Sequence, residues 1–371
     1  MSGTVRENQE LRIAFVGDIM PGGLFVRAGG VGKEVLDHLK TFDLRIGTLE
    51  TALGDGSTLC HLKNNPELGT IIFSPDDSVK MLLQMGINAV SLANNHSCDC
   101  DLAGLYHTMD VLDRNGILHF GAGHTSEEAA APAIIHCKGK TICLLGYLQP
   151  YHYFYRGPGY IPSATEGGVN IYSLEKVLSD VRKYKALYDY VFVMPHWGTE
   201  GSAIPKYREI KDARTIIAVG ADGVIGSHAH VVQPVMRYRG GLLAMNLGNF
   251  AFPDRYVVNP RISYYPTEEE LAAGNIPEVS AFKPVGQLSL KRVVRRERQG
   301  IVLGATLSGE GKSFNLYQTE LSVNNRIEKR AKVPFPERTS SLFLNLISRD
   351  PSGVFLRLFS KLSRWMRSGK N

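Results

Sequence analysis

A chain of 371 residues that is 43% hydrophobic and 21% charged is typical of a globular protein and can bury one large core. The net charge of +6 is uneven: residues 326–371 carry eleven Lys or Arg and three acidic residues, which leaves a charge of −2 for residues 1–325. The body therefore lacks the basic footprint of a nucleic-acid-binding protein, and we exclude nucleic acid as a partner. Five cysteines, an odd number, exclude a disulfide-rich scaffold.

The N-terminal segment has no apolar core that is typical of a signal peptide. No run of about 18 apolar residues, the length of a membrane-spanning helix, occurs elsewhere in the chain. From the sequence we therefore expect a cytoplasmic protein.

Short apolar runs recur along the chain, and each ends in a polar or glycine-rich cluster. Their length and β-branched content favour buried strands, with helix-like segments between them. This alternation predicts an α/β architecture, in which a ligand binds where loops converge beyond the strand ends. The expected strands lie at 13–18, 44–50, 88–96, 190–198, 222–230 and 242–250, and the expected helices at 74–86, 101–116 and 173–184.

The C-terminal third of the chain changes character twice. Residues 286–321 read as short strands separated by turns, which we interpret as part of the same domain. We therefore expect a domain at 11–325, with a β-rich completion at 256–325, and a basic tail at 326–371.

Seven polar side chains stand at the ends of the apolar runs. Carboxylate, amide and imidazole groups together suit Mn²⁺, Fe or Zn²⁺, and a bridging carboxylate can hold two such cations about 3.5–4 Å apart. Each residue also has an ordinary structural explanation, such as a turn aspartate or a buried imidazole, and one His-x-His is weak evidence. Their joint occurrence favours a metal cluster. The residues are Asp18, Glu50, Asn95, His96, His196, His228 and His230.

The motifs around these residues resemble a known family when they are taken as an ordered set. GDIMPGG, TLE, SLANNH, FGAG, PHWGTE, GSHAHVVQP and NLGNFAF are similar to the motifs of the CapA family of poly-γ-glutamate capsule-synthesis proteins, which resembles the calcineurin-like metallophosphoesterases. The resemblance covers about residues 11–255, the motif core. It implies a four-layer α/β/β/α sandwich with two divalent metal ions between the sheet edges.

The resemblance also implies a role for each residue. Asp18 and His230 correspond to ligands of the first metal, Glu50 to the bridging acid, and Asn95, His196 and His228 to ligands of the second metal. His96 corresponds to a catalytic acid or oxyanion-stabilising group, for which an imidazole is suited. Glu200 and Asn249 are weaker candidates: Glu200 for orienting a ligand, and Asn249 for contacting substrate.

Two positions depart from the phosphoesterase pattern. Glu50 stands at the bridging position, where those enzymes have an Asp that is one methylene shorter. Those enzymes carry Asp-x-His where this chain has Asp18-Ile19-Met20, and a thioether is a poor donor for a hard cation. The expected activity is hydrolysis of a phosphoester by a metal-activated water assisted by His96, with a phosphoester or an anionic polymer as substrate. The alternatives are a non-catalytic accessory factor of a capsule or exopolysaccharide complex, and an amide-bond enzyme acting on γ-glutamyl polymer.

Within the tail, residues 354–367 have a helical apolar period with a cationic opposite face. Such a helix can lie on an anionic membrane surface, or it can dock on a capsule-synthesis complex or on the body of the protein. We expect peripheral membrane association, which co-sedimentation of the full chain with anionic vesicles would report.

Overall fold

The computed structural model describes residues 10–28, 30–57, 70–150, 166–258, 261–273, 288–309 and 311–333. The expected amphipathic helix at 354–367 lies outside these ranges. Within them, no helix combines the length and the apolar character that crossing a membrane requires.

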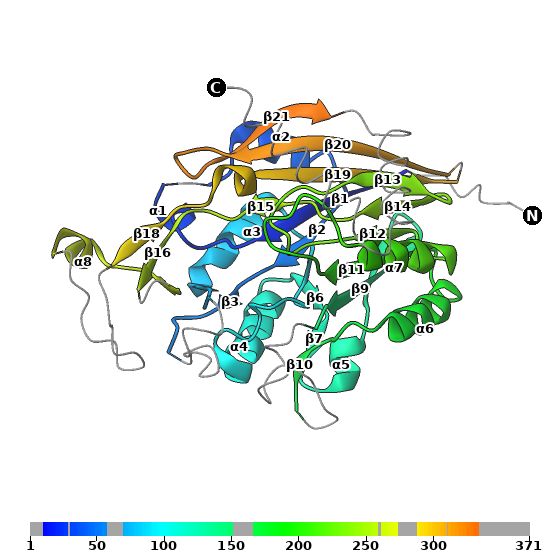
Figure 1. Cartoon of the computed structure of the whole chain (residues 1–371), viewed down its shortest axis with the longest axis horizontal. Helices are drawn as coiled ribbons and strands as arrows, with labels where there is room; N and C mark the ends of the chain where they lie inside the picture. Colours follow the sequence, from blue (N-terminus) through cyan, green and yellow to red (C-terminus); the bar gives the residue numbers. More distant parts are fainter. Residues whose placement is uncertain are drawn as a thin grey trace, which may run out of the picture.

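Two β-sheets form the centre of the structure (Figure 1). The first has eight strands, most of them parallel around β1, with an antiparallel hairpin at one edge and β15 paired separately with β1. Its strands in spatial order are β21 (Ile327–Val333), β20 (Gly311–Leu321), β19 (Gln299–Ser308), β1 (Leu11–Ile19), β2 (Leu44–Leu49), β5 (Ala89–Ser91) and β6 (Leu118–Phe120), with β15 at Asn249–Ala251.

The second sheet has six strands, of which β9, β11, β12 and β14 are parallel. It packs face to face on the first sheet through a cluster of buried apolar side chains, and the rings of Phe15 and Phe192 meet there at 4.8 Å between centroids. Its strands in spatial order are β13 (Val235–Tyr238), β14 (Gly241–Ala244), β12 (Gly223–Ile225), β11 (Tyr190–His196), β9 (Lys140–Leu148) and β8 (Ala133–Cys137).

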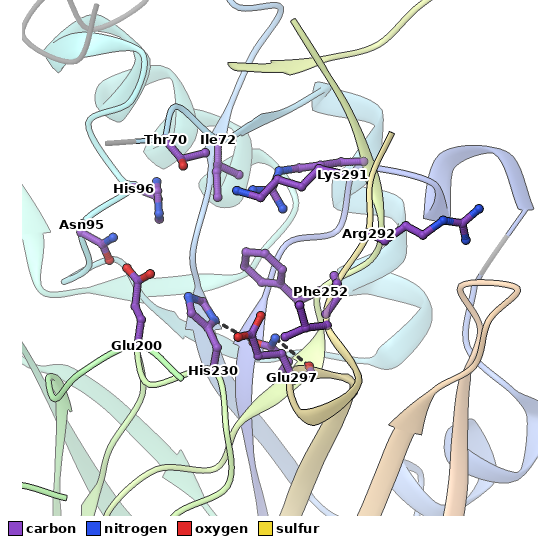
Figure 2. Close-up of a pocket in the computed structure, with 14 residues that line it drawn as sticks. Thr70, Ile72, Asn95, His96, Glu200, His230, Phe252, Lys291, Arg292 and Glu297 are labelled. Carbon is purple, nitrogen blue, oxygen red and sulfur yellow. Dashed lines mark hydrogen bonds between the residues drawn. The ribbon is translucent and has the colours of Figure 1, made fainter. Parts of the chain in front are cut away.

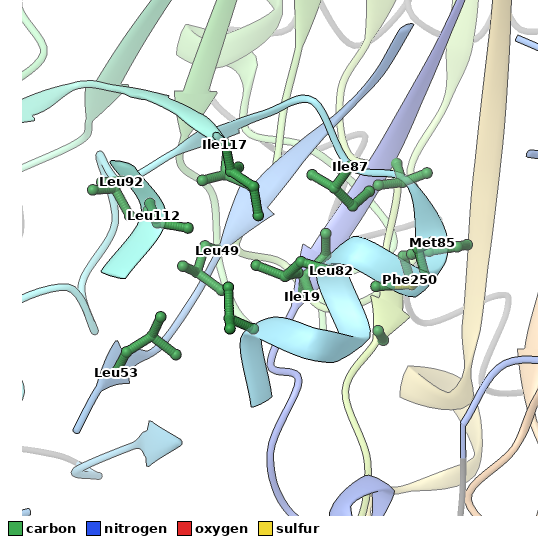
Figure 3. Close-up of a cluster of buried hydrophobic side chains, with 14 of the residues drawn as sticks. Ile19, Leu49, Leu53, Leu82, Met85, Ile87, Leu92, Leu112, Ile117 and Phe250 are labelled. Carbon is green, nitrogen blue, oxygen red and sulfur yellow. The ribbon is translucent and has the colours of Figure 1, made fainter. Parts of the chain in front are cut away.

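Helices cover the outer face of each sheet because the strands are apolar on both faces. In β1, for example, Ile13 faces the other sheet, whereas Ala14 and Val16 face the helices. Helices α2 (Lys33–Leu39), α3 (Val79–Met85) and α4 (Asp101–Arg114) cover the first sheet, and α6 (Leu174–Lys185) and α7 (Tyr207–Ala218) cover the second. Figure 3 shows side chains of α3 and α4, among them Leu82 and Leu112, in the buried apolar cluster that they form with the first sheet. The four-layer α/β/β/α sandwich is confirmed.

Smaller elements surround this sandwich. A three-stranded sheet of β17, β16 and β18 borders the candidate site, and two pairs of short strands connect the loops. These elements are α1 (Phe25–Ala28), β3 (Ala52–Leu53), β4 (Phe73–Ser74), η1 (Asp76–Ser78), β7 (Ala122–Gly123), α5 (Ser126–Ala130), β10 (Gly168–Val169), β16 (Arg255–Val258), β17 (Ile262–Tyr264), α8 (Glu268–Ala273), β18 (Ser289–Lys291) and η3 (Arg295–Arg298).

Two local expectations from the sequence differ from the structure. The helix expected at 74–86 begins only at η1 and continues as α3, because Pro75 keeps the preceding residue extended and Phe73–Ser74 forms β4. The short strands expected at 286–321 are mainly the long hairpin of β19 and β20. β21 extends that sheet beyond residue 325, where the sequence placed the start of the tail.

Candidate metal centre

All seven predicted side chains converge at the ends of strands from both sheets. Asp18 lies near the end of β1, and Glu50 follows β2 directly. Asn95 and His96 follow β5, His196 ends β11, and His228 and His230 follow β12. The carboxyl ends of parallel strands meet at one edge of each sheet. Because the two sheets face each other, the loops at these edges lie close together. Side chains from seven sequence positions therefore share one buried site.

The ligand atoms form two groups that share Glu50. Asp18, Glu50 and His230 make one group, in which Nε2 of His230 lies 3.5 Å from Oε1 of Glu50. Glu50, His196 and His228 make the other, in which Nε2 of His196 lies 3.4 Å from the same oxygen. Within each group the ligand atoms lie within 4.8 Å of one another. One carboxylate common to two sets of donors is the arrangement that a bridged pair of cations requires.

Asn95 belongs to the second group. Its Oδ1 lies 2.6 Å from Nε2 of His196, and the same nitrogen lies 3.1 Å from Nδ1 of His228. An amide oxygen and two imidazole nitrogens thus point at one another from three different loops. The tautomers of the two imidazoles decide which nitrogen donates in these hydrogen bonds, and with both nitrogens deprotonated the three atoms can serve as ligands of one cation.

The backbone at the His-x-His segment has an unusual conformation. His228 has a φ of 91° and His230 a φ of 56°, both in the left-handed region that residues with a Cβ rarely adopt. The amide of His228 donates to Oδ2 of Asp18 at 3.1 Å. The two histidines therefore lie in a strained loop and not on the expected strand at 222–230, since β12 ends at Ile225. Strain of this kind is concentrated at functional sites.

Two polar side chains orient the imidazoles. Ser227 Oγ lies 2.8 Å from Nδ1 of His196, and Asn249 Oδ1 lies 2.8 Å from Nδ1 of His230. In both cases the Nε2 atom is left facing Glu50. A hydrogen bond to the far nitrogen fixes both the orientation and the tautomer of a metal-binding histidine. Asn249 thus orients the imidazole of His230, and its own Nδ2 donates a hydrogen bond to the carbonyl oxygen of Glu297 at 2.8 Å.

The electrostatics of the cluster are those of a cation site. Burial, and then the charge of Glu50, raise the pKa of Asp18, and burial raises that of Glu50. Oδ1 of Asp18 and both oxygens of Glu50 are buried without a hydrogen-bond partner in the described part of the chain. Burial, and then neighbouring imidazoles, hold the pKa values of His196 and His228 well below the usual value, so both are neutral. Unsatisfied carboxylate oxygens beside neutral imidazoles fit divalent cations.

Mn²⁺ affinity is expected to rise with pH between about 7 and 9, by roughly tenfold per pH unit for one released proton. Burial disfavours the charged form of His230, but Glu50 and Asp18 outweigh it and raise its pKa to about 9. His230 must therefore lose a proton before its Nε2 can bind a cation. Mn²⁺ titrations at constant ionic strength would measure this dependence. His230→Gln should flatten it, and an affinity that does not change with pH would contradict it.

His96 belongs to neither of the two donor groups. Its Nδ1 lies 2.6 Å from Oδ2 of Asp99, and its Nε2 lies 4.0 Å from Oε1 of Glu50. Asp99 also accepts from the amide of Ile72 at 2.6 Å, so it is itself fixed. The imidazole therefore presents Nε2 to the site while a buried carboxylate holds the other nitrogen.

A pocket of about 250 Å³ opens above the cluster (Figure 2). Asn95, His96, His230 and Asn249 line its floor, and Glu200 lies at its rim with an exposed side chain. Three lining side chains are cationic, namely Arg255, Lys291 and Arg292.

Some features of the site were missed by sequence reasoning. Asp99 carries a local signal, since it stands three residues after His96, and Ser227 directly precedes His228. Arg255 and Lys291 have no local signal in the sequence, because only the fold brings them to the pocket. Met20 is fully buried in an apolar cluster with Phe252 and provides no donor to the cluster of carboxylates and imidazoles.

Comparison with known proteins agrees with the ordered motifs. The model of the family described as "Bacterial capsule synthesis protein PGA_cap" matches residues 12–254. The chain belongs to this family. The resemblance inferred from the sequence is thus confirmed, and its extent is close to the expected motif core.

Individual members of this family are distant in sequence. The chain is 25% identical over 345 residues to capsule biosynthesis protein CapA of Bacillus anthracis, covering 88% of this chain and 82% of that protein. It is 28% identical over 255 residues to PGA biosynthesis protein CapA of Bacillus subtilis (strain 168), covering 65% of this chain and 63% of that protein. Among solved structures, a hypothetical protein from Thermus thermophilus has a TM-score of 0.43 at 15% identity, covering 87% of this chain and 100% of that one.

Proposed function

We propose that this protein is a metal-dependent hydrolase that cleaves a phosphoester during the synthesis of a capsule or poly-γ-glutamate polymer. The observation that carries the proposal is the shared carboxylate: Glu50 belongs to both donor groups, and both of its oxygens are buried without a hydrogen-bond partner among the described residues. Asp18 and His230 would hold one cation with Glu50. Asn95, His196 and His228 would hold the other.

When bound, such a pair of cations acidifies a water molecule and stabilises the charge that develops on the phosphoryl oxygens. The chain provides the remaining parts. Ser227 and Asn249 keep the imidazoles of His196 and His230 oriented, and burial excludes bulk water from the carboxylates. His96 donates a proton from Nε2 to the departing oxygen while Asp99 stabilises the positive imidazole.

The test combines metal analysis with a phosphoester assay. Purified protein is expected to retain Mn²⁺, Fe or Zn²⁺ and to hydrolyse a generic aryl phosphoester. His228→Ala should lower the activity by more than about 100-fold, because it removes a donor from one cation position. His136→Ala, an exposed histidine on β8, is the matched control and should leave both readouts unchanged. The proposal is wrong if the protein holds no metal and has no turnover, or if His228→Ala leaves turnover unchanged.

A non-catalytic function is the second candidate, and the environment of Met20 favours it. Phosphoesterases of this pattern have a histidine at that position, whereas Met20 packs against Ile72, Phe252 and Val293. One of the two cation positions would then have fewer donor atoms. The metal would stabilise the structure or bind polymer instead of supporting catalysis. Bound metal without turnover of either an aryl phosphoester or a γ-glutamyl peptide would support this function.

A further inference from the structure

Two cationic side chains stand opposite each other at the wall of the pocket. In the antiparallel pair of β16 and β18, Arg255 is in register with Lys291. Residues directly opposite in such a pair project to the same face, with Cβ atoms about 4.5–5.5 Å apart, and like charges in that position are destabilising. Both residues line the pocket above the metal centre. The repulsion between them calls for a compensating negative charge.

Arg255 has no ion pair within the described chain, and the charges of Glu50, Glu297 and Asp254 stabilise it only from a distance. The residue is only 5% exposed, and its Nε is buried without a hydrogen-bond partner. Its guanidinium lies over the ring of Phe252, 5.7 Å from the centroid, and burial lowers its pKa. An unpaired buried guanidinium is costly, whereas guanidinium groups bind oxyanions strongly because the donors form a planar fork.

The neighbouring carboxylates are engaged elsewhere. Asp254, next to Arg255 in sequence, accepts from Nη2 of Arg298 at 2.6 Å and from the amide of Val293 at 2.8 Å. Glu297 lies 3.7 Å from the guanidinium of Arg296. Glu200 lies across the pocket, on the side of Asn95 (Figure 2), and its charge and that of Glu297 act on Lys291 against the effect of burial on its pKa. The pocket lining still carries three cations, Arg255, Lys291 and Arg292, against these two carboxylates, and it is therefore net positive next to the loops that hold the metal donors.

We propose that Arg255 and Lys291 form an anion subsite that binds a second negatively charged group of the substrate, a carboxylate or phosphate, beside the metal centre. The inference rests on the proposed function, because that function places the reacting phosphoester at the metal centre. The subsite itself consists of side chains that are not metal donors. Arg255 binds the oxyanion through its planar fork, and Lys291 adds a mobile ammonium at the pocket opening. This subsite would select a substrate that carries one negative charge at the scissile bond and a second one where it can reach Arg255 and Lys291. An anionic polymer has such charges.

The experiment measures anion binding without turnover. Inorganic phosphate and glutarate, a dicarboxylate, are titrated by calorimetry into the full chain freed of metal. Arg255→Met and Lys291→Gln are each expected to weaken binding of the preferred anion by about 10- to 100-fold, the range for hydrogen bonds to charged groups. Arg208→Met, an exposed arginine on α7, is the matched control and should bind both anions as the unaltered chain does. The tighter of the two anions identifies the chemical group.

Thermal unfolding separates a binding role from a structural one. In buffer without phosphate or carboxylate, Arg255→Met should melt no lower than the unaltered chain, because methionine removes an unpaired buried charge and keeps an apolar contact with Phe252. If Arg255→Met does not fold, Lys291→Gln decides, since Lys291 is exposed. Unchanged affinity for both anions in the folded variants overturns the subsite. Bound Mn²⁺, Fe and Zn²⁺ and phosphoester turnover are measured in parallel on the unaltered chain before metal is removed: the absence of both metal and turnover would refute the proposed function and leave the anion result standing.

Discussion

Glu50→Gln is expected to remove both cations at once, which no other single substitution in the cluster should do. Glu50 is the carboxylate that belongs to both donor groups, and His196 and His230 each lie within 3.5 Å of its Oε1. An amide keeps the shape but has no charge and only one oxygen donor. The metal content of the purified variant should fall from two ions per chain to near zero, while His228→Ala affects the Glu50–His196–His228 group alone.

The loss of activity should be correspondingly large. A pair of cations contributes several kcal/mol to the transition state, so Glu50→Gln should lower kcat/KM by about 10³-fold or more. Elemental analysis after dialysis, with a phosphoester assay on the same samples, would measure both effects. Glu127→Gln is the matched control, because Glu127 is an exposed acid on α5 and does not line the pocket. A Glu50→Gln protein that retained two ions would show that the carboxylate does not bridge.

The stability of the metal-free protein gives an independent check on Glu50. Its two oxygens are buried without a hydrogen-bond partner in the described residues, and burial raises its pKa. A neutral amide at this position removes the cost of burying a negative charge, although it is still a buried polar group. Without metal, and at a pH above about 9 where His230 is neutral and does not need the charge of Glu50, Glu50→Gln should therefore melt no lower than the unaltered chain. A large fall in its melting temperature would point to an indispensable structural role instead.

The donors of the metal centre were accessible from the sequence for a physical reason. Each stands where an apolar strand ends, and parallel strands deliver their carboxyl ends to a common edge. Asp18, Glu50 and His196 could therefore be singled out by their positions along the chain alone. The orientation of the imidazoles was not accessible, because the hydrogen bonds of Ser227 and Asn249 depend on strained loops that no periodicity predicts.

The C-terminal strands show why the rest of the fold was harder to predict. Gly300 and Gly304 interrupt 299–308 in a way that is typical of turns, yet both lie inside β19. A Cβ at Gly300 would lie 2.1 Å from the carbonyl oxygen of Asn249, and one at Gly304 would lie 2.9 Å from the ring of Phe42. These glycines allow close approach and do not turn the chain. The pairing of Arg255 with Lys291 likewise depends on a register that only the folded chain defines.

Asp99→Asn is expected to slow hydrolysis without loss of metal, and the slowing should depend on the leaving group. Asp99 lies 2.6 Å from Nδ1 of His96 and accepts from the amide of Ile72. Both contacts are to the same oxygen, Oδ2, so the Asn oxygen can still accept from Ile72 and from Nδ1 of His96, but it has no negative charge to stabilise the positive imidazole. General acid catalysis contributes about 10²–10⁴-fold, so kcat for an alkyl phosphoester should fall by about 100-fold.

A nitrophenyl ester provides the discriminating comparison, because its leaving group departs as a stable anion and needs no proton. Asp99→Asn and His96→Asn should therefore slow alkyl esters much more than nitrophenyl esters, with unchanged Mn²⁺ content in both variants. Equal slowing of both esters would mean that His96 stabilises charge on the phosphoryl oxygens and does not donate a proton. Loss of metal from His96→Asn would place the imidazole among the ligands, although it belongs to neither donor group.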